Sequence, residues 1–377
     1  MARLRGKCYC KEKLTSAITK YTELDPALRL ELKKIVEALS AAGKGVLAAD
    51  ESVSTLEKKF HEINIENNEQ TRRDYRQMLF STEKLELARY ISGVILNHET
   101  IHQMTSDGSE FSEFLRQRNI IPGVKVDKGL TYMFGTKDEL TTQGLDDLQE
   151  RCIQYKKDGC HFAKWKCVYH VNDRLPSQLA LKANAHVLAR YASICQSARL
   201  VPIVQSEILN TGDYDINRAG RVHEEMLSIL FRSLMEYRVY LEGMILRPAM
   251  VMPGKDNPKY CLPKIIAEYT VKALQRTVPC AVPAIMFLGS AQSDKEVTLN
   301  LNAINTFEGR KPWVLSFCFG RPLRDAAFRA WSGNFENTKE AQLIFLKNAM
   351  EYSLASQGRL ETNENENCIR SFGDSAG

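Results

Sequence analysis

Charged and amide side chains recur along this 377-residue chain at the ends of short apolar runs. Side chains two positions apart on a strand point to the same side, so Lys164 should face the same way as Lys166. Gln205 and Glu207 have the same spacing. Charges within apolar strands are costly unless they are paired or functional, and their recurrence favours a ligand pocket. The ionised members of the set are Asp50, Lys125, Lys164, Lys166, Glu207, Arg247 and Arg321.

The balance of charge in this set predicts the kind of ligand. If the side chains converge, five cations face two carboxylates, which leaves an excess of three positive charges. Such a pocket suits small molecules that carry phosphate groups. Alternatively, some of these side chains point to the outer helices and form ion pairs there, and their spacing agrees with either arrangement.

Eight short apolar runs must position these residues. Several runs are almost continuously hydrophobic, which is typical of parallel strands covered on both faces. The segments between them are long enough for crossover helices, so the pattern predicts a (β/α)₈ TIM barrel of the α/β class, with a doubly wound open sheet as the alternative. The predicted strands are residues 46–49, 91–96, 124–126, 162–168, 200–204, 240–246, 281–288 and 313–319.

The barrel prediction takes residues 22–358 as one domain, because no linker rich in Gly, Ser or Pro divides them. Residues 22–42 are predicted to form an N-terminal helix that Gly43 ends. Residues 1–21 form a basic extension, and residues 359–377 form a polar segment that we expect to be a mobile tail.

Composition narrows the class of protein further. A formal net charge of +5 is small for a chain of this length and gives no reason to expect a nucleic-acid or membrane partner. No apolar run approaches 18 residues, and the ten cysteines have neither zinc-finger nor paired spacing. We therefore expect a cytoplasmic protein with reduced cysteines.

Two short motifs match known binding patterns but stand in the wrong context. Residues 43–48 read GKGVLA, yet they precede a predicted strand, whereas a dinucleotide-binding turn follows one. Residues 98–102 read HETIH, the zinc protease pattern, but they begin where a strand should end and no third ligand stands nearby. We expect neither motif to bind its usual ligand.

Longer segments resemble the class I fructose-bisphosphate aldolases, from about residue 28 to residue 358. The resemblance implies a (β/α)₈ barrel, a homotetramer or a mixed tetramer with active paralogues, and cleavage of fructose 1,6-bisphosphate through a lysine Schiff base without metal or other cofactor. The segments are GKGVLAADES (43–52), GVKVDKG (123–129), TTQGLDDLQERCIQYKKDG (141–159), FAKWKCV (162–168), ANAHVLARYASICQ (183–196), YLEGMILRPAMV (240–251), LNLNAIN (299–305) and FGRPL (319–323).

The resemblance also assigns roles to single residues. Asp50, Lys164 and Glu207 stand at catalytic positions and are retained. Two of the substrate contacts, Lys59 and Lys166, replace family arginines and so lose the bidentate fork. The full set of substrate and phosphate contacts that the resemblance implies is Ser52, Lys59, Lys125, Lys166, Gly289, Ser290, Ala291 and Arg321.

Two catalytic positions depart from the family pattern. Arg247 stands where the family has its Schiff-base lysine, and Gln205 stands where it has its main proton-transfer glutamate. We therefore favour a catalytically impaired homologue that still binds sugar phosphates or assembles with active paralogues. One alternative is a working aldolase with Lys164 as a substitute nucleophile, and another is a non-enzymatic scaffold, to which only the basic extension points.

Overall fold

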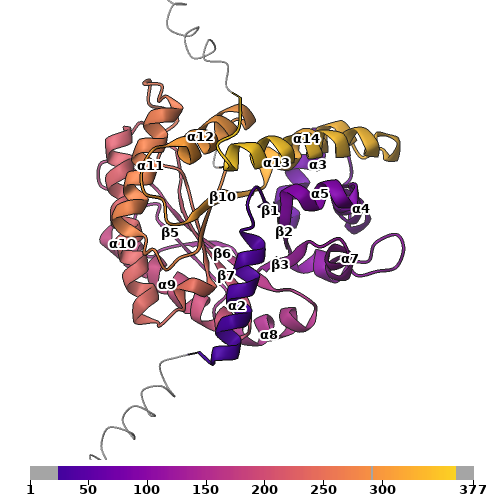
Figure 1. The fold of residues 1–377 in the computed structure, drawn as a ribbon, viewed down its shortest axis with the longest axis horizontal. Helices are drawn as coiled ribbons and strands as arrows, with labels where there is room; N and C mark the ends of the chain where they lie inside the picture. Colours follow the sequence, from indigo (N-terminus) through magenta and orange to yellow (C-terminus); the bar gives the residue numbers. More distant parts are fainter. Residues whose placement is uncertain (1–23, 290–291, 362–377) are drawn as a thin grey trace, which may run out of the picture.

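Eight parallel strands close into a barrel within residues 24–289 and 292–361, the part of the chain that the computed structural model describes (Figure 1). Each strand pairs with the next one in the sequence, and the last pairs with the first. The predicted TIM barrel is thus confirmed, and the open sheet is excluded. The strands are β1 (Gly45–Ala49), β2 (Ile91–Leu96), β3 (Ile121–Lys125), β6 (Phe162–Tyr169), β7 (Val201–Ile208), β8 (Ile245–Pro248), β9 (Ala284–Phe287) and β10 (Val314–Phe319).

The strand bounds differ most from the prediction at β8. Residues 240–244 were predicted to open this strand, but Leu241–Gly243 form a 3₁₀ turn. The side-chain amide of Gln196 donates to the carbonyl groups of Tyr240 and Gly243 and so satisfies the backbone of the turn. A local side-chain interaction therefore replaces strand pairing there.

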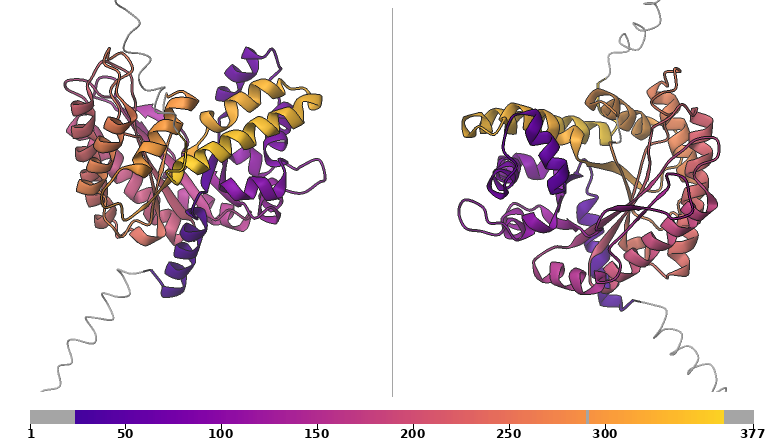
Figure 2. Two further views of the ribbon diagram at one scale, coloured as in Figure 1. Left: turned by 45° about the horizontal axis from the view of Figure 1, so that its top comes forward. Right: turned by 180° about the vertical axis from the view of Figure 1, so that it is seen from behind.

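Helices cover the outside of the barrel (Figures 1 and 2). Several begin at a side chain that accepts a hydrogen bond from the first helical turn, as Ser177 and Asp215 do, and Ser293 forms a reciprocal capping box with Glu296. The helices are α3 (Val53–Glu62), α4 (Glu69–Phe80), α5 (Lys84–Tyr90), α6 (His98–Ile101), α7 (Phe111–Gln117), α8 (Leu148–Lys157), α9 (Gln178–Ser197), α10 (Ile216–Glu236), α11 (Pro263–Thr277), α12 (Asp294–Thr306), α13 (Arg321–Trp331) and α14 (Thr338–Ser356).

Helix α2 (Pro26–Leu39) closes the amino-terminal end of the barrel. Its buried side chains, Leu32, Val36 and Leu39, pack against Phe162 and Ile245, the first residues of β6 and β8. The helix ends three residues earlier than predicted, at Leu39, while Gly43 adopts a positive φ of 72° in the turn to β1. The interior is therefore filled with apolar side chains at this end, which leaves the opposite end for a polar site.

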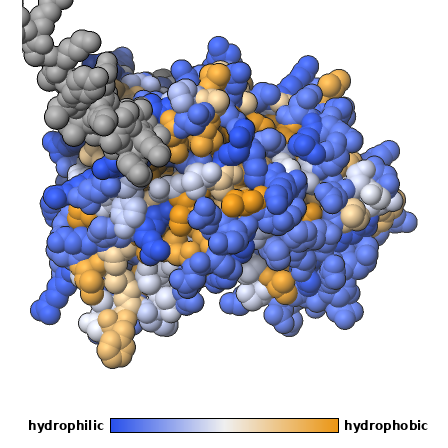
Figure 3. All heavy atoms as spheres, turned by 90° about the horizontal axis from the view of Figure 1, so that it is seen from below, coloured by the Kyte–Doolittle hydropathy of each residue, from blue (hydrophilic) through white to orange (hydrophobic). Residues whose placement is uncertain are grey.

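Two further features complete the fold. An antiparallel pair of short strands, β4 (Leu130–Tyr132) and β5 (Leu140–Thr142), follows β3 and was not predicted, because three residues are too few to show a pattern. Helix α14 packs against α13 and α12 and also against α4 and α5, so it joins the last part of the chain to the first (Figure 2). Figure 3 shows a largely hydrophilic face with small hydrophobic patches between the hydrophilic residues.

Several sequence predictions concern residues outside the described part. These are the basic extension (1–21), the tail beyond residue 361, and the loop residues Ser290 and Ala291. The HETIH motif spans α6, where Nδ1 of His98 lies 3.1 Å from the Tyr155 hydroxyl. Within the described ranges, no three His, Cys, Asp or Glu side chains gather as a metal site would require, and none of the helices has the length and apolarity needed to span a bilayer.

His223 on α10 should make the stability of the fold depend on pH. The residue is 3% exposed, and its Nδ1 lies 2.8 Å from the Ala219 carbonyl oxygen. Burial lowers the pKa of His223 to about 4. The unfolded chain takes up a proton on this imidazole near pH 6.5, whereas the folded chain does so only near pH 4. The free energy of unfolding should therefore fall by about 3 kcal/mol as the pH is lowered from 6.5 to 4.

Urea unfolding from pH 7 to pH 4 would measure this loss. The variant His223→Gln should show a shallower loss, because its amide does not titrate. The control His186→Gln removes an exposed imidazole on α9 and should leave the pH dependence unchanged. Equal slopes for His223→Gln and the unmodified chain would show that His223 is not the group responsible.

Candidate active site at the barrel mouth

The parallel register brings the predicted polar residues to one end of the barrel. Lys125 on β3 pairs with Lys164 on β6, and Lys166 pairs with Gln205 on β7, which in turn pairs with Arg247 on β8. Because parallel strands all end at the same side, these residues lie together near the carboxyl ends, where barrel proteins hold their reactive groups. We call this end the barrel mouth.

An ion pair between Asp50 and Lys164 crosses the barrel mouth. Asp50 follows β1 and Lys164 lies on β6, and two strands separate them around the barrel. Oδ2 of Asp50 is 2.7 Å from Nζ of Lys164, which is 4% exposed. Burial alone would raise the pKa of the Asp50 carboxyl, but the charges of Lys164, Arg247 and Lys125 together hold it well below its usual range. Asp50 is therefore a carboxylate at neutral pH.

The Arg247 side chain extends from β8 across the barrel interior to β10. Its Nε and Nη2 atoms donate to the carbonyl oxygen of Cys318 on β10, at 3.1 Å and 2.6 Å, although β9 lies between β8 and β10. Its Nη1 donates to Oε1 of Gln205. Nε2 of Gln205 donates to Oε2 of Glu207 at 2.8 Å, as expected for side chains on the same side of a strand. The Gln205 amide thus stands between a guanidinium and a carboxylate.

Lys125 binds a carboxylate that the charge count from the sequence left out. Its Nζ lies 2.8 Å from Oδ1 of Asp127 and donates to the Asp127 carbonyl oxygen. The Asp127 side chain is buried, so this ion pair lowers the positive excess expected at the barrel mouth. Lys166, in register with Gln205, is half-buried.

A buried charge cluster behind Asp50 was missed by sequence reasoning. Glu51 contacts Arg324 on α13, and its Oε2 lies 2.7 Å from Nη2 of Arg76 on α4. Lys59 on α3 pairs with Asp325, whose carboxylate is 3.6 Å from Arg324. The two arginines lie on helices without any charge pattern that points inward, so only the fold brings them together. The cluster anchors the residue next to Asp50 to two outer helices.

The loops after β9 and β10 meet at the rim of the mouth. A Cβ on Gly289 would lie 2.6 Å from Cγ of Pro322 in the first turn of α13, so only glycine allows this approach. Arg321 is the first residue of α13, whose amino-terminal N–H groups favour an anion. On α3, in contrast, the Ser52 hydroxyl caps the helix by accepting from the Thr55 N–H at 3.2 Å.

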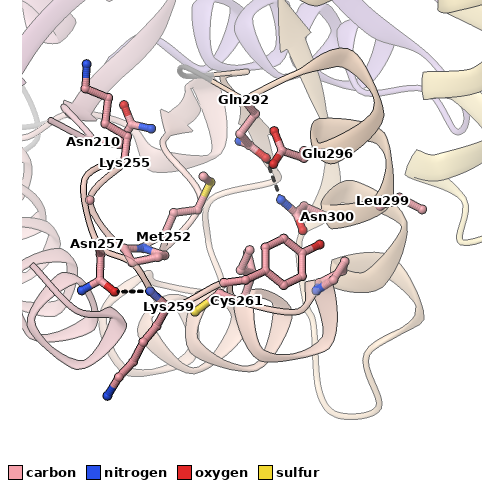
Figure 4. A pocket seen from close by; sticks show the side chains of 15 residues that line it. Asn210, Met252, Lys255, Asn257, Lys259, Cys261, Gln292, Glu296, Leu299 and Asn300 are labelled. Atoms are coloured by element: carbon pink, nitrogen blue, oxygen red, sulfur yellow. Dashed lines mark hydrogen bonds between the residues drawn. The ribbon is translucent and has the colours of Figure 1, made fainter. Parts of the chain in front are cut away.

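A cavity of about 230 Å³ lies beside this site and was also missed. It is lined by the loops after β7 and β8 and by the starts of α11 and α12, and none of the mouth residues described above contributes to it. Figure 4 shows Gln292 and Asn300 on one side, joined by a 2.7 Å hydrogen bond, with Met252 opposite them and Lys259 directed away. Its lining residues come from three separate segments of the chain and share no pattern in the sequence.

The structure is that of a (β/α)₈-barrel protein with charged side chains gathered at the carboxyl ends of its strands. The chain belongs to the class I fructose-bisphosphate aldolase family, described as glycolytic, whose family model matches residues 31–372.

Curated relatives support the assignment over most of their lengths. The chain is 52% identical to a fructose-bisphosphate aldolase of Echinococcus multilocularis, over 88% of this chain and 91% of the relative. It is 47% identical to human fructose-bisphosphate aldolase C, over 90% and 93%. Among solved structures, fructose-bisphosphate aldolase from Plasmodium falciparum, crystallised with TRAP and a small-molecule inhibitor, matches with a TM-score of 0.88 at 42% identity, covering 90% of this chain and 98% of that one.

The Glu51 cluster should be essential for stability. Replacing Glu51 with alanine leaves the buried guanidinium of Arg76 without a carboxylate and Arg324 with only Asp325. An uncompensated buried charge is strongly destabilising, so the free energy of unfolding should fall by about 3–5 kcal/mol in urea titrations.

A matched control is the exposed Arg232–Glu236 pair on α10, where Glu236→Ala should cost less than about 1 kcal/mol. Similar losses for the two variants would contradict a special role for Glu51.

Proposed function

We propose that this chain binds sugar phosphates such as fructose 1,6-bisphosphate at the barrel mouth but does not cleave them through a Schiff base. The observation that carries the proposal is the state of Arg247, which is 6% exposed and bonded to Cys318 and Gln205. By resemblance it stands at the position of the family's nucleophilic lysine. A guanidinium keeps its proton at physiological pH and has no lone pair with which to form an imine.

The groups around Arg247 support the same conclusion. Gln205, at the position of the proton-transfer glutamate, carries an amide that does not titrate. Asp50 is held as a carboxylate by its cationic neighbours, so it can accept a proton but does not replace the acid lost at position 205. Loss of one member of a coupled catalytic set reduces turnover on the order of 10⁶-fold, and here two positions differ.

The substitute nucleophile, Lys164, is paired with Asp50. A Schiff base needs a neutral amine, whereas this contact stabilises a charged ammonium beside a carboxylate. To react, Lys164 would have to give up its proton and the attraction of its partner inside a buried site. The ion pair therefore favours a binding role for Lys164 over a nucleophilic one.

The proposed binding of phosphate relies on the cationic side chains that this chain shares with the family. Arg321 and the amino terminus of α13 lie beside Gly289 at the rim, which is where barrel proteins often bind phosphate. Lys166 supplies further positive charge near the strand ends, where Lys125 and Lys164 each pair with an aspartate. The curated relatives of this chain are fructose-bisphosphate aldolases. By analogy with that family, we also propose that this protein is cytoplasmic and forms a homotetramer or a mixed tetramer with active paralogues.

Binding without covalent chemistry is the central expectation. Isothermal titration with fructose 1,6-bisphosphate at low salt should show binding, while borohydride reduction in the presence of dihydroxyacetone phosphate should leave the mass of the protein unchanged. A covalent adduct on Lys164 would instead establish the active aldolase with a substitute amine. No heat of binding at millimolar ligand would remove the ligand part of the proposal and favour a scaffold.

Restoring the two substituted groups should restore cleavage. In Arg247→Lys with Gln205→Glu, we expect cleavage at least about 100-fold above that of the unmodified chain, because a single missing member costs on the order of 10⁶. A third change, Asp50→Asn, should abolish the recovered activity and show that it arises at the barrel mouth. An inactive double variant that still binds ligand would mean that other residues around the site have also lost their catalytic roles.

A further inference from the structure

Arg247 differs from the other buried cations in having no acidic partner. Four lysine or arginine side chains are buried among the described residues. Arg76 and Arg324 contact Glu51, and Lys164 contacts Asp50. For Arg247, in contrast, no carboxylate of the described chain lies within salt-bridge distance, and its acceptors are a backbone carbonyl and an amide. Buried charges are normally compensated, and the only carboxylate in the described ranges on which Arg247 is seen to act is Asp50, which already pairs with Lys164.

The hydrogen-bonding capacity of Arg247 is also only partly used. A guanidinium carries five N–H donors, and three of them donate to Cys318 and Gln205. Lys164 offers three donors, of which Asp50 occupies one. Both cations also act on the same carboxylate. Burial raises the pKa of Asp50, whereas the charge of Lys164 and, less strongly, that of Arg247 lower it. Two cations with unused donors therefore both act on the Asp50 carboxylate in the barrel mouth.

We propose that the barrel mouth binds phosphorylated carboxylic acids, with the ligand carboxylate on Arg247 and Lys164 and its phosphate at the rim near Arg321. The inference rests on the phosphate site of the proposed function and names a different ligand class for that site. A carboxylate brings one negative charge and two oxygens in a plane, which matches the remaining donors of a guanidinium. A ketone carbonyl accepts hydrogen bonds but leaves the buried charge uncompensated.

The Gln205 amide keeps Arg247 available for such a ligand. It accepts from Arg247 and donates to Glu207, so it satisfies both groups without contributing charge. A glutamate at this position would be a counter-ion in direct contact with Arg247 and would compete with the ligand carboxylate. The pair of substitutions therefore acts together: the arginine supplies a cation, and the glutamine leaves that cation unneutralised.

Two probes that differ only at the relevant group test the inference by isothermal titration. 3-Phosphoglycerate and glycerol 3-phosphate share a three-carbon chain and a phosphate, but only the first has a carboxylate. The unmodified chain should bind 3-phosphoglycerate at least about tenfold more tightly, as expected for charge-assisted hydrogen bonds. Gln205→Glu and, separately, Arg247→Gln should each reduce this preference to within about twofold. Arg321→Gln should weaken both probes and leave their ratio unchanged.

The outcomes separate this inference from the proposed function. Equal affinity of the unmodified chain for the two probes would overturn the inference, and the proposed function would stand if fructose 1,6-bisphosphate still binds without a borohydride adduct. A preference that persists in both Gln205→Glu and Arg247→Gln would also overturn it, because another group would then bind the carboxylate. If neither probe nor fructose 1,6-bisphosphate binds, both proposals fail. Gln205→Glu is nearly isosteric, so the test holds even if Arg247→Gln does not fold.

Discussion

Compensation of charge inside a closed barrel is the constraint on which this site depends. Lys164 and Arg247 are buried in the mouth, and a buried charge needs a partner or a ligand. Asp50 and Lys164 meet this requirement by spanning the interior from β1 to β6. The pairing keeps the Asp50 carboxyl ionised, and it occupies both side chains. A lysine held this way is suited to attract an anion rather than to attack a carbonyl.

The surrounding structure holds this ion pair in place. Glu51, next to Asp50, is bound by arginines from α4 and α13, so the end of β1 is fixed by helices far apart in the sequence. At the other end of the barrel, α2 packs apolar side chains against the first residues of the strands. The polar contacts are therefore confined to one end, where their mutual attraction is strengthened by the low dielectric constant of the interior.

Arg247 and Gln205 change the character of the pocket together. The family chemistry needs a neutral amine and a titratable acid, and the two substitutions put a fixed cation and a neutral amide at those positions. The amide bridges Arg247 and Glu207 in the folded chain, so both side chains remain hydrogen-bonded within a buried site. An arginine introduced without the glutamine would pair with a glutamate there. The substitutions are thus consistent with one another and with a pocket that binds anions.

The alternation of strands and helices and the residues at the strand ends could be predicted from the amino-acid sequence. Periodicity and chain order suffice for this, because parallel strands align their carboxyl ends and neighbouring side chains alternate. The sequence alone therefore predicts that four polar residues lie together, namely Lys125, Lys164, Gln205 and Arg247. Only the tertiary structure decided which group each one contacts. Asp127 binds Lys125, Glu51 joins two distant arginines, and Arg247 reaches across to β10, and such contacts depend on side-chain directions across a closed barrel, which local patterns do not encode.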